Sequence, residues 1–296
     1  MSTQPSQHHL DVPGGSVYYE RRGSGPLLLV IGQPMTSGAF GPLADLLAED
    51  HTVVTYDPHG VGESTVDDPS LAVTPEIEAD DLAHIVDAIG DGKADVFGTS
   101  GAAVAGLALV ANYPEKVGTL IAHEPPVPDL LPDAPHVRKV VDDVEDTYRA
   151  YGTGAAWGKF ASLVMHSGPV SEDGVPPVAW PPPGAEGQDG EGAEGAAEMP
   201  SEPTAKQRAD DELFFLRMLK PFTRYQPAID VLRTAGPRVV VAVGGTSHDE
   251  IPSRSAEALA EQLGTSAAVF PGGHAGFLDD PAGFAAKIRQ VLADPR

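Results

Sequence analysis

The stretch FGTSGA, residues 97–102, decides how this sequence folds. It follows an apolar run at residues 94–97 that is typical of a buried strand, and it opens a helical pattern at residues 101–113. Gly98 and Ala102 stand two positions before and after Ser100, and both are small enough for a sharp strand-to-helix turn with a strained backbone. In isolation the stretch also fits an ordinary glycine-rich turn with a helix-capping serine. The elements on either side of it favour the strained turn.

Outward from this turn, short apolar runs alternate with helical patterns. The predicted strands are residues 16–20, 27–31, 52–56, 94–97, 119–122, 238–243 and 267–270. The predicted helices between them are residues 41–50, 74–89, 101–113, 252–263 and 281–292. This alternation predicts an α/β protein with a mostly parallel central sheet and helices on both faces.

Residues 125–228 interrupt the alternation. Helical patterns occur here at residues 142–151, 155–165 and 205–219. Between them, residues 171–202 contain eight acidic residues, no basic ones, six glycines and six prolines. Such a segment buries too little apolar surface to offset its ordering entropy, so we expect residues 171–202 to form a mobile loop without a recognition role.

Composition excludes several classes of function. The 296 residues carry a formal net charge of −24, which argues against nucleic acid and against an anionic membrane surface as partners. The chain has no cysteine, so disulfides, thiolate metal sites and a cysteine nucleophile are excluded. Its polar first ten residues and the lack of a long apolar run predict no signal peptide and no membrane span. We therefore expect a cytoplasmic protein, whose oligomeric state the sequence leaves open.

A serine hydroxyl becomes a nucleophile when a base takes its proton, and histidine is the usual base near neutral pH. Of the ten histidines, His274 stands out, because it lies in PGGHAGF, residues 271–277, between the last predicted strand and the last predicted helix. A loop in that place reaches the carboxyl edge of the sheet, where ligands bind in open α/β folds. We expect Ser100 and His274 to act together there.

Three motifs together resemble the α/β-hydrolase fold family of the serine-nucleophile type. They are YDPHGVGES at residues 56–64, the turn around Ser100, and Gly272-Gly273-His274, and the resemblance runs from residue 16 to residue 292 outside the interruption. It implies a core of residues 1–124 and 229–296 and a helical cap of residues 125–228 inserted after the sixth strand. It also implies an oxyanion hole made by the backbone N–H groups of Gln33 and Gly101.

The resemblance leaves two positions for the acid that orients the histidine. Relatives commonly carry it as Gly-x-x-Asp after the seventh strand, but this chain has Ser247 there and an aspartate, Asp249, two residues later. Other members carry the acid after the sixth strand, where this chain has Glu124 followed by two prolines. We favour Glu124 and leave Asp249 open.

The resemblance implies a serine hydrolase that cleaves a carboxylic ester, lactone or related small acyl substrate through an acyl-enzyme. Perhydrolase, thioesterase, C–C hydrolase or lyase chemistry, or non-catalytic binding of a small molecule, is the alternative on the same fold. The histidines lack metal-ligand spacing and no phosphate-binding glycine loop is present, so we expect neither a metal nor an organic cofactor.

Overall fold

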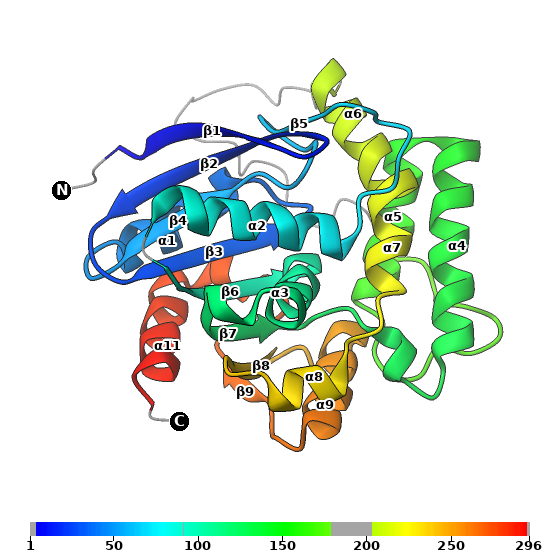
Figure 1. Cartoon of the computed structure of the whole chain (residues 1–296). Helices are drawn as coiled ribbons and strands as arrows, with labels where there is room; N and C mark the ends of the chain where they lie inside the picture. The colour runs from blue at the N-terminus through cyan, green and yellow to red at the C-terminus, as the bar shows by residue number, and fades with distance from the viewer. Residues whose placement is uncertain (1–3, 91, 179–202, 295–296) are drawn as a thin grey trace, which may run out of the picture.

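The computed structural model describes residues 4–90, 92–178 and 203–294. Its strands are β1 (Ser6–Val12), β2 (Gly15–Gly23), β3 (Leu27–Gln33), β4 (Thr52–Tyr56), β5 (Thr65–Val66), β6 (Ala94–Ser100), β7 (Val117–His123), β8 (Arg238–Gly244) and β9 (Ala268–Phe270). They form one sheet in the order β1-β2-β4-β3-β6-β7-β8-β9, with the short β5 beside β2 (Figure 1). Every neighbouring pair from β4 to β9 is parallel, as the sequence predicts.

Helices cover both faces of this sheet. The helices of the sheet region are α1 (Gly41–Leu47), α2 (Pro75–Ile89), α3 (Gly101–Asn112), α8 (Ile229–Thr234), α9 (Ile251–Leu263), α10 (Gly276–Asp279) and α11 (Pro281–Ala293). Helices α2 and α3 pack together on one face, and α1 and α11 pack together on the other (Figure 1). The strands between them read as continuous apolar runs because a parallel sheet is buried on both sides, and β3 is buried along its whole length.

Strand β1 was not predicted. It pairs antiparallel with β2 at the edge of the sheet, from Ser6 opposite Arg21 to Val12 opposite Gly15. Its residues are polar and mostly exposed, so the strand lacks the apolar run by which buried strands are recognised. Backbone pairing with β2 orders it instead.

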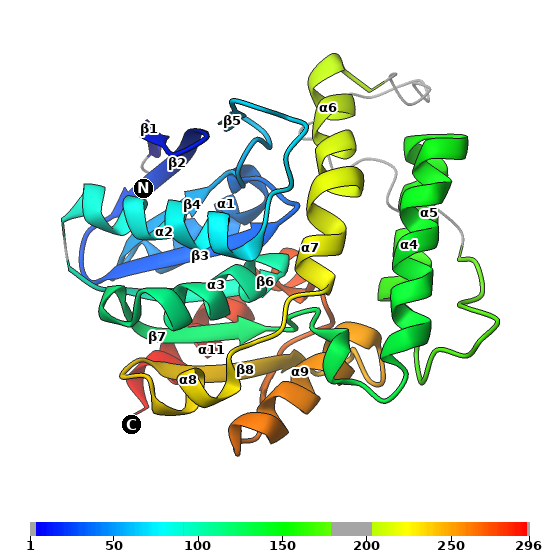
Figure 2. The same cartoon turned by 45° about the vertical axis from the view of Figure 1, so that its right-hand side comes forward.

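Residues 125–228 contribute a separate group of helices, which stands beyond the carboxyl edge of the sheet (Figures 1 and 2). They are α4 (Ala134–Tyr151), α5 (Thr153–Val164), α6 (Ala205–Leu213) and α7 (Leu219–Thr223), with a π-helical turn at Phe214–Met218 between the last two. Helix α4 starts eight residues earlier than the predicted start at residue 142, because Pro135 occupies its first turn. Of the predicted mobile loop 171–202, residues 179–202 lie outside the described residues.

An ion pair ties this group of helices to the sheet region. Arg254 on α9 contacts both carboxylate oxygens of Asp133, at 2.6 and 3.1 Å, and also donates to the carbonyl of Gly168 at 2.8 Å. Asp133, directly before α4, accepts the backbone N–H of Val170 as well. Such two-point contacts fix orientation as well as distance.

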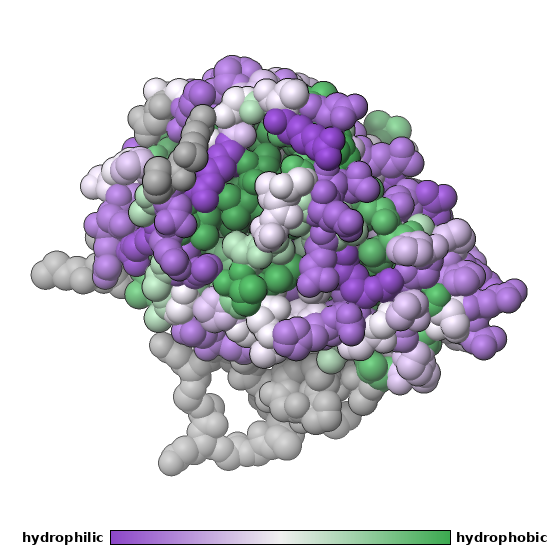
Figure 3. All heavy atoms as spheres, turned by 90° about the horizontal axis from the view of Figure 1, so that it is seen from below, coloured by the Kyte–Doolittle hydropathy of each residue, from purple (hydrophilic) through white to green (hydrophobic). Residues whose placement is uncertain are grey.

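Seen from below, apolar residues gather near the centre of the surface inside a polar rim (Figure 3). The edge strand β9 lies toward this side in Figure 1, and its Val269 is exposed. Among the described residues, no helix combines the length and apolar character needed to cross a membrane.

Candidate active site

Ser100 lies at a strained turn between β6 and α3. Its backbone has φ 55° and ψ −130°, a conformation that residues with a side chain rarely adopt. A methyl group on Gly98 would come within 2.9 Å of the carbonyl oxygen of Ala102, and Ala102 itself is fully buried. The small residues on either side therefore allow the tight turn, and the turn holds Ser100 at the carboxyl end of β6.

The structure brings His274 and Glu124 together, although they are 150 residues apart in the sequence. His274 Nδ1 lies 2.6 Å from Glu124 Oε2, and the Glu124 carboxyl group is completely buried. Burial alone would raise the pKa of Glu124, but the hydrogen bond and charge of His274 lower the pKa below its ordinary value. Glu124 is therefore an ionised carboxylate that can only accept hydrogen bonds, so His274 Nδ1 carries the proton and donates the hydrogen bond to Glu124.

Backbone contacts hold the carboxylate in this orientation. Glu124 follows β7 with φ 47°, and its own N–H donates to the carbonyl of Ala242 at 2.9 Å. Its second oxygen, Oε1, accepts the N–H of Gly244 at 2.8 Å. Gly244 has no room for a side chain, since a methyl group there would come within 2.8 Å of the Gly273 backbone, next to His274. The end of β8 thus positions both partners.

The alternative acid does not take this place. Asp249 is exposed, and its backbone is in the left-handed region with φ 59°. Its carbonyl accepts the N–H of Gly168 at 2.8 Å, so the residue lies toward the inserted helices. Ser247, at the position where relatives commonly carry the acid, is fully buried, and its Oγ has no hydrogen-bond partner among the described residues.

Gln33 and Gly101 lie next to Ser100. In the parallel register of β3 and β6, Gln33 is the direct partner of Ser100. Gly101 begins α3, and a methyl group on it would overlap with Oε1 of Gln33. The two residues whose N–H groups are expected to form the oxyanion hole are therefore packed against each other beside the serine hydroxyl.

A second histidine lies behind this pair. The ring of His123 stacks near the ring of His274, with centroids 6.5 Å apart, and its Nδ1 is hydrogen-bonded to Thr99 Oγ1 at 3.0 Å. It is fully buried and packs against Phe270 and Phe284. Burial lowers the pKa of His123 to about 4, so this imidazole is neutral at physiological pH.

The pKa of His123 gives a prediction for acid stability. Between pH 6.5 and about 4 the unfolded chain binds a proton at His123 that the folded protein excludes, so folding stability falls as the pH drops through this range. We expect a loss of roughly 3 kcal/mol, at about 1.4 kcal/mol per pH unit. The control is His123→Phe, because phenylalanine suits the aromatic surroundings and does not titrate. Urea unfolding gives the free energy of unfolding of both proteins, and the difference between them should change by this amount between pH 6.5 and about 4. Parallel pH curves for the two proteins would contradict the assignment.

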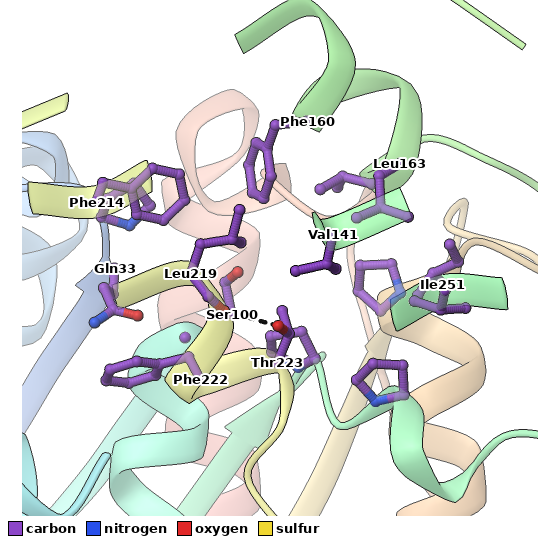
Figure 4. Close-up of a pocket in the computed structure, with 17 residues that line it drawn as sticks. Gln33, Ser100, Val141, Phe160, Leu163, Phe214, Leu219, Phe222, Thr223 and Ile251 are labelled. Atoms are coloured by element: carbon purple, nitrogen blue, oxygen red, sulfur yellow. Dashed lines mark hydrogen bonds between the residues drawn. The ribbon is translucent and has the colours of Figure 1, made fainter. Parts of the chain in front are cut away.

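A cavity of about 560 Å³, its open mouth included, lies between Ser100 and the inserted helices. Figure 4 shows Val141, Leu219 and Thr223 around Ser100, with Phe160 and Leu163 further out. All the residues that line it are uncharged, and most are aliphatic, aromatic or proline. A cavity with this uncharged and largely apolar wall suits an apolar group.

The model of a known family, described as the alpha/beta hydrolase fold, matches residues 25–281 of this chain. The match spans most of the sequence and every strand from β3 to β9. The chain belongs to the alpha/beta hydrolase fold family. This confirms the fold class and the family that the motifs predict.

Two curated proteins to which this chain is similar are named as hydrolases. The uncharacterized hydrolase YraK of Bacillus subtilis is 26% identical over 96% of this chain and 94% of its own length. A putative carbamate hydrolase, RutD of Caulobacter segnis, is 32% identical over 39% of this chain and 42% of its own length.

Solved structures share the fold of this alpha/beta hydrolase. MGS-M2, an alpha/beta hydrolase from a Medee basin deep-sea metagenome library, superposes with a TM-score of 0.71 at 15% identity, covering 98% of both chains. A thermophilic esterase from Thermogutta terrifontis superposes with a TM-score of 0.68 at 19% identity, again over 98% of both chains.

The sequence did not predict which residues of this alpha/beta hydrolase line the cavity. Phe214, Leu219 and Phe222 line it from the π-helical turn and α7. Their spacing along a helix marks an apolar face, but it does not tell what that face covers. Within the described ranges, no three His, Cys, Asp or Glu side chains are grouped so that they could hold a metal ion.

Proposed function

We propose that the chain is a serine hydrolase that cleaves a small carboxylic ester, lactone or related acyl substrate through an acyl-enzyme. One observation carries the proposal: a serine on a strained turn opens into an apolar cavity, in a fold that also pairs a part-buried His274 with the buried Glu124. A surface serine or a capping serine requires none of these features.

In the proposed mechanism, His274 Nε2 accepts the proton of Ser100 as Oγ attacks the carbonyl carbon. Glu124 fixes the histidine tautomer through Nδ1 and stabilises the imidazolium ion. The N–H groups of Gln33 and Gly101 stabilise the oxyanion of the tetrahedral intermediate. The imidazolium then protonates the leaving alcohol, and water activated by His274 releases the acid.

Two measurements test this function against its alternatives. A fluorophosphonate probe should label Ser100, as peptide mass spectrometry would show, and a chain without labelling would be a non-catalytic binder. A panel of p-nitrophenyl esters, thioesters and lactones then separates ester or lactone hydrolysis from other chemistry on this fold. Turnover of thioesters alone would overturn the ester assignment.

The uncharged cavity wall supports a neutral, apolar acyl group, and we propose that residues 125–228 act as the cap that selects it. Val141 on α4 lines the cavity close to Ser100 in Figure 4, whereas Val144, three residues further along the same helix, is equally buried without lining the cavity.

We expect Val141→Phe to shift the preference of the enzyme toward shorter acyl chains, because the larger ring occupies space that a long chain needs. The ratio of kcat/KM for p-nitrophenyl hexanoate to that for the acetate should fall about 10-fold or more. Val144→Phe is the matched control, and it should leave this ratio unchanged. An equal shift in both variants would show that disturbance of α4, rather than cavity volume, is responsible.

A further inference from the structure

A buried glutamate that the proposed mechanism does not use contacts Gln33, one of the two residues assigned to the oxyanion hole. Glu78, in the first turn of α2, is completely buried. Its Oε1 accepts a hydrogen bond from Gln33 Nε2 at 2.7 Å, and its Oε2 accepts one from Tyr56 OH at 2.8 Å. Each carboxylate oxygen therefore has one partner, from the end of β3 and from the end of β4.

Burial of a carboxylate is unfavourable unless hydrogen bonds compensate it. Burial raises the pKa of Glu78 to about 7, although the hydrogen bonds from Tyr56 and Gln33 oppose this. Glu78 also occupies the buried face of α2, in line with Leu82 and Ile85, where a leucine would be the usual residue. Core packing alone gives no reason for a glutamate at this position.

The side chain of Gln33 connects Glu78 to the site. The Nε2 end of its amide is held by Glu78, and the Oε1 end lies against Cα of Gly101. The two N–H groups assigned to the oxyanion hole belong to these same two residues, Gln33 and Gly101. A rotation of the Gln33 amide away from Glu78 would remove the contact between Gln33 and Gly101.

We propose that Glu78 is a positioning residue of the oxyanion hole, which acts by fixing the side chain of Gln33 between α2 and the start of α3. This inference rests on the proposed function, since it concerns the same hole. Glu78 does not touch the substrate, so its removal changes stabilisation of the transition state more than binding of the ground state.

The test is a double-mutant cycle between Gln33→Ala and Glu78→Ala, with p-nitrophenyl butyrate as substrate at pH 8. Each single variant should lower kcat about 10-fold or more while KM stays nearly constant. The double variant should be no slower than the slower single variant, because both substitutions remove the same tether. The inhibition constant of phenylboronic acid, whose adduct with Ser100 places an oxygen in the hole, should rise by the same factor as kcat falls.

Glu78→Gln provides the conservative variant if Glu78→Ala does not fold. The amide oxygen of the new glutamine can accept the hydrogen bond from Gln33 Nε2, and the Tyr56 hydroxyl can rotate to accept one from its NH₂ group. We therefore expect this variant to keep most of the wild-type kcat. Asp81→Asn is the matched control: Asp81 is buried one turn further along the same helix, but it pairs with His59 at 2.8 Å. We expect this control to keep the wild-type kcat.

If the losses in kcat of the two single variants multiply in the double variant, Glu78 acts independently of Gln33, and the inference is overturned. Unchanged kcat in folded Glu78→Ala would also overturn it. These results differ from a failure of the proposed function, in which the wild-type chain itself neither hydrolyses the ester nor reacts with a fluorophosphonate.

Discussion

Replacement of Ser100 by alanine is expected to abolish ester hydrolysis while leaving the fold intact. In the proposed mechanism the hydroxyl attacks the carbonyl carbon, whereas alanine retains the Cβ that the turn already accommodates at φ 55°. Loss of the nucleophile from a comparable triad lowers kcat by about 10⁶-fold. Hydrolysis of p-nitrophenyl butyrate measures the effect, and circular dichroism with thermal unfolding checks the fold.

His274→Ala should cause a loss of similar size, and the double variant with Ser100→Ala should be no slower than either single variant. The members of a triad act as a unit, so their effects do not multiply. A folded Ser100→Ala protein that keeps more than a few per cent of wild-type hydrolysis would show that another group carries the reaction.

The sequence predicted the central fold because local patterns determine it. Strand β4 and the starts of α3, α11 and β8 lie at the predicted residues, since apolar runs and proline or glycine at element ends are local signals. The Ser100 turn was predicted for the same reason: its steric demands fall on Gly98 and Ala102, which are neighbours in the sequence.

Features that depend on distant partners were harder to predict. The sequence favoured Glu124 but left Asp249 open as the partner of His274, because the contact that holds Glu124, with Gly244 at the end of β8, lies far away in the sequence. Strand β1 is ordered by pairing with β2, and the cavity wall is assembled from α4, α5 and α7 across the inserted region. Glu78 left one trace in the sequence, a charged residue on the apolar face of α2.

The second large effect is expected for Glu124→Gln. In the wild type, His274 Nδ1 donates to Oε2 and the N–H of Gly244 donates to Oε1, so both oxygens of the carboxylate act as acceptors. A glutamine has a single acceptor oxygen. Placed toward Gly244, it leaves its NH₂ group facing Nδ1, which must then be an acceptor, and the ring proton moves to Nε2. That tautomer cannot accept the proton of Ser100.

The opposite rotamer of the glutamine is also unfavourable, because it directs the NH₂ group at the N–H of Gly244 inside a fully buried site. We therefore expect kcat to fall on the order of 10⁴-fold, by analogy with the change of aspartate to asparagine in a serine protease triad. Asp249→Asn is the matched control, since Asp249 is exposed and its side chain can lose its charge without affecting the His274 tautomer. If Asp249→Asn is the slow variant and Glu124→Gln keeps wild-type kcat, the acid that orients His274 in solution is Asp249, and the loop after β8 must rearrange to bring it there.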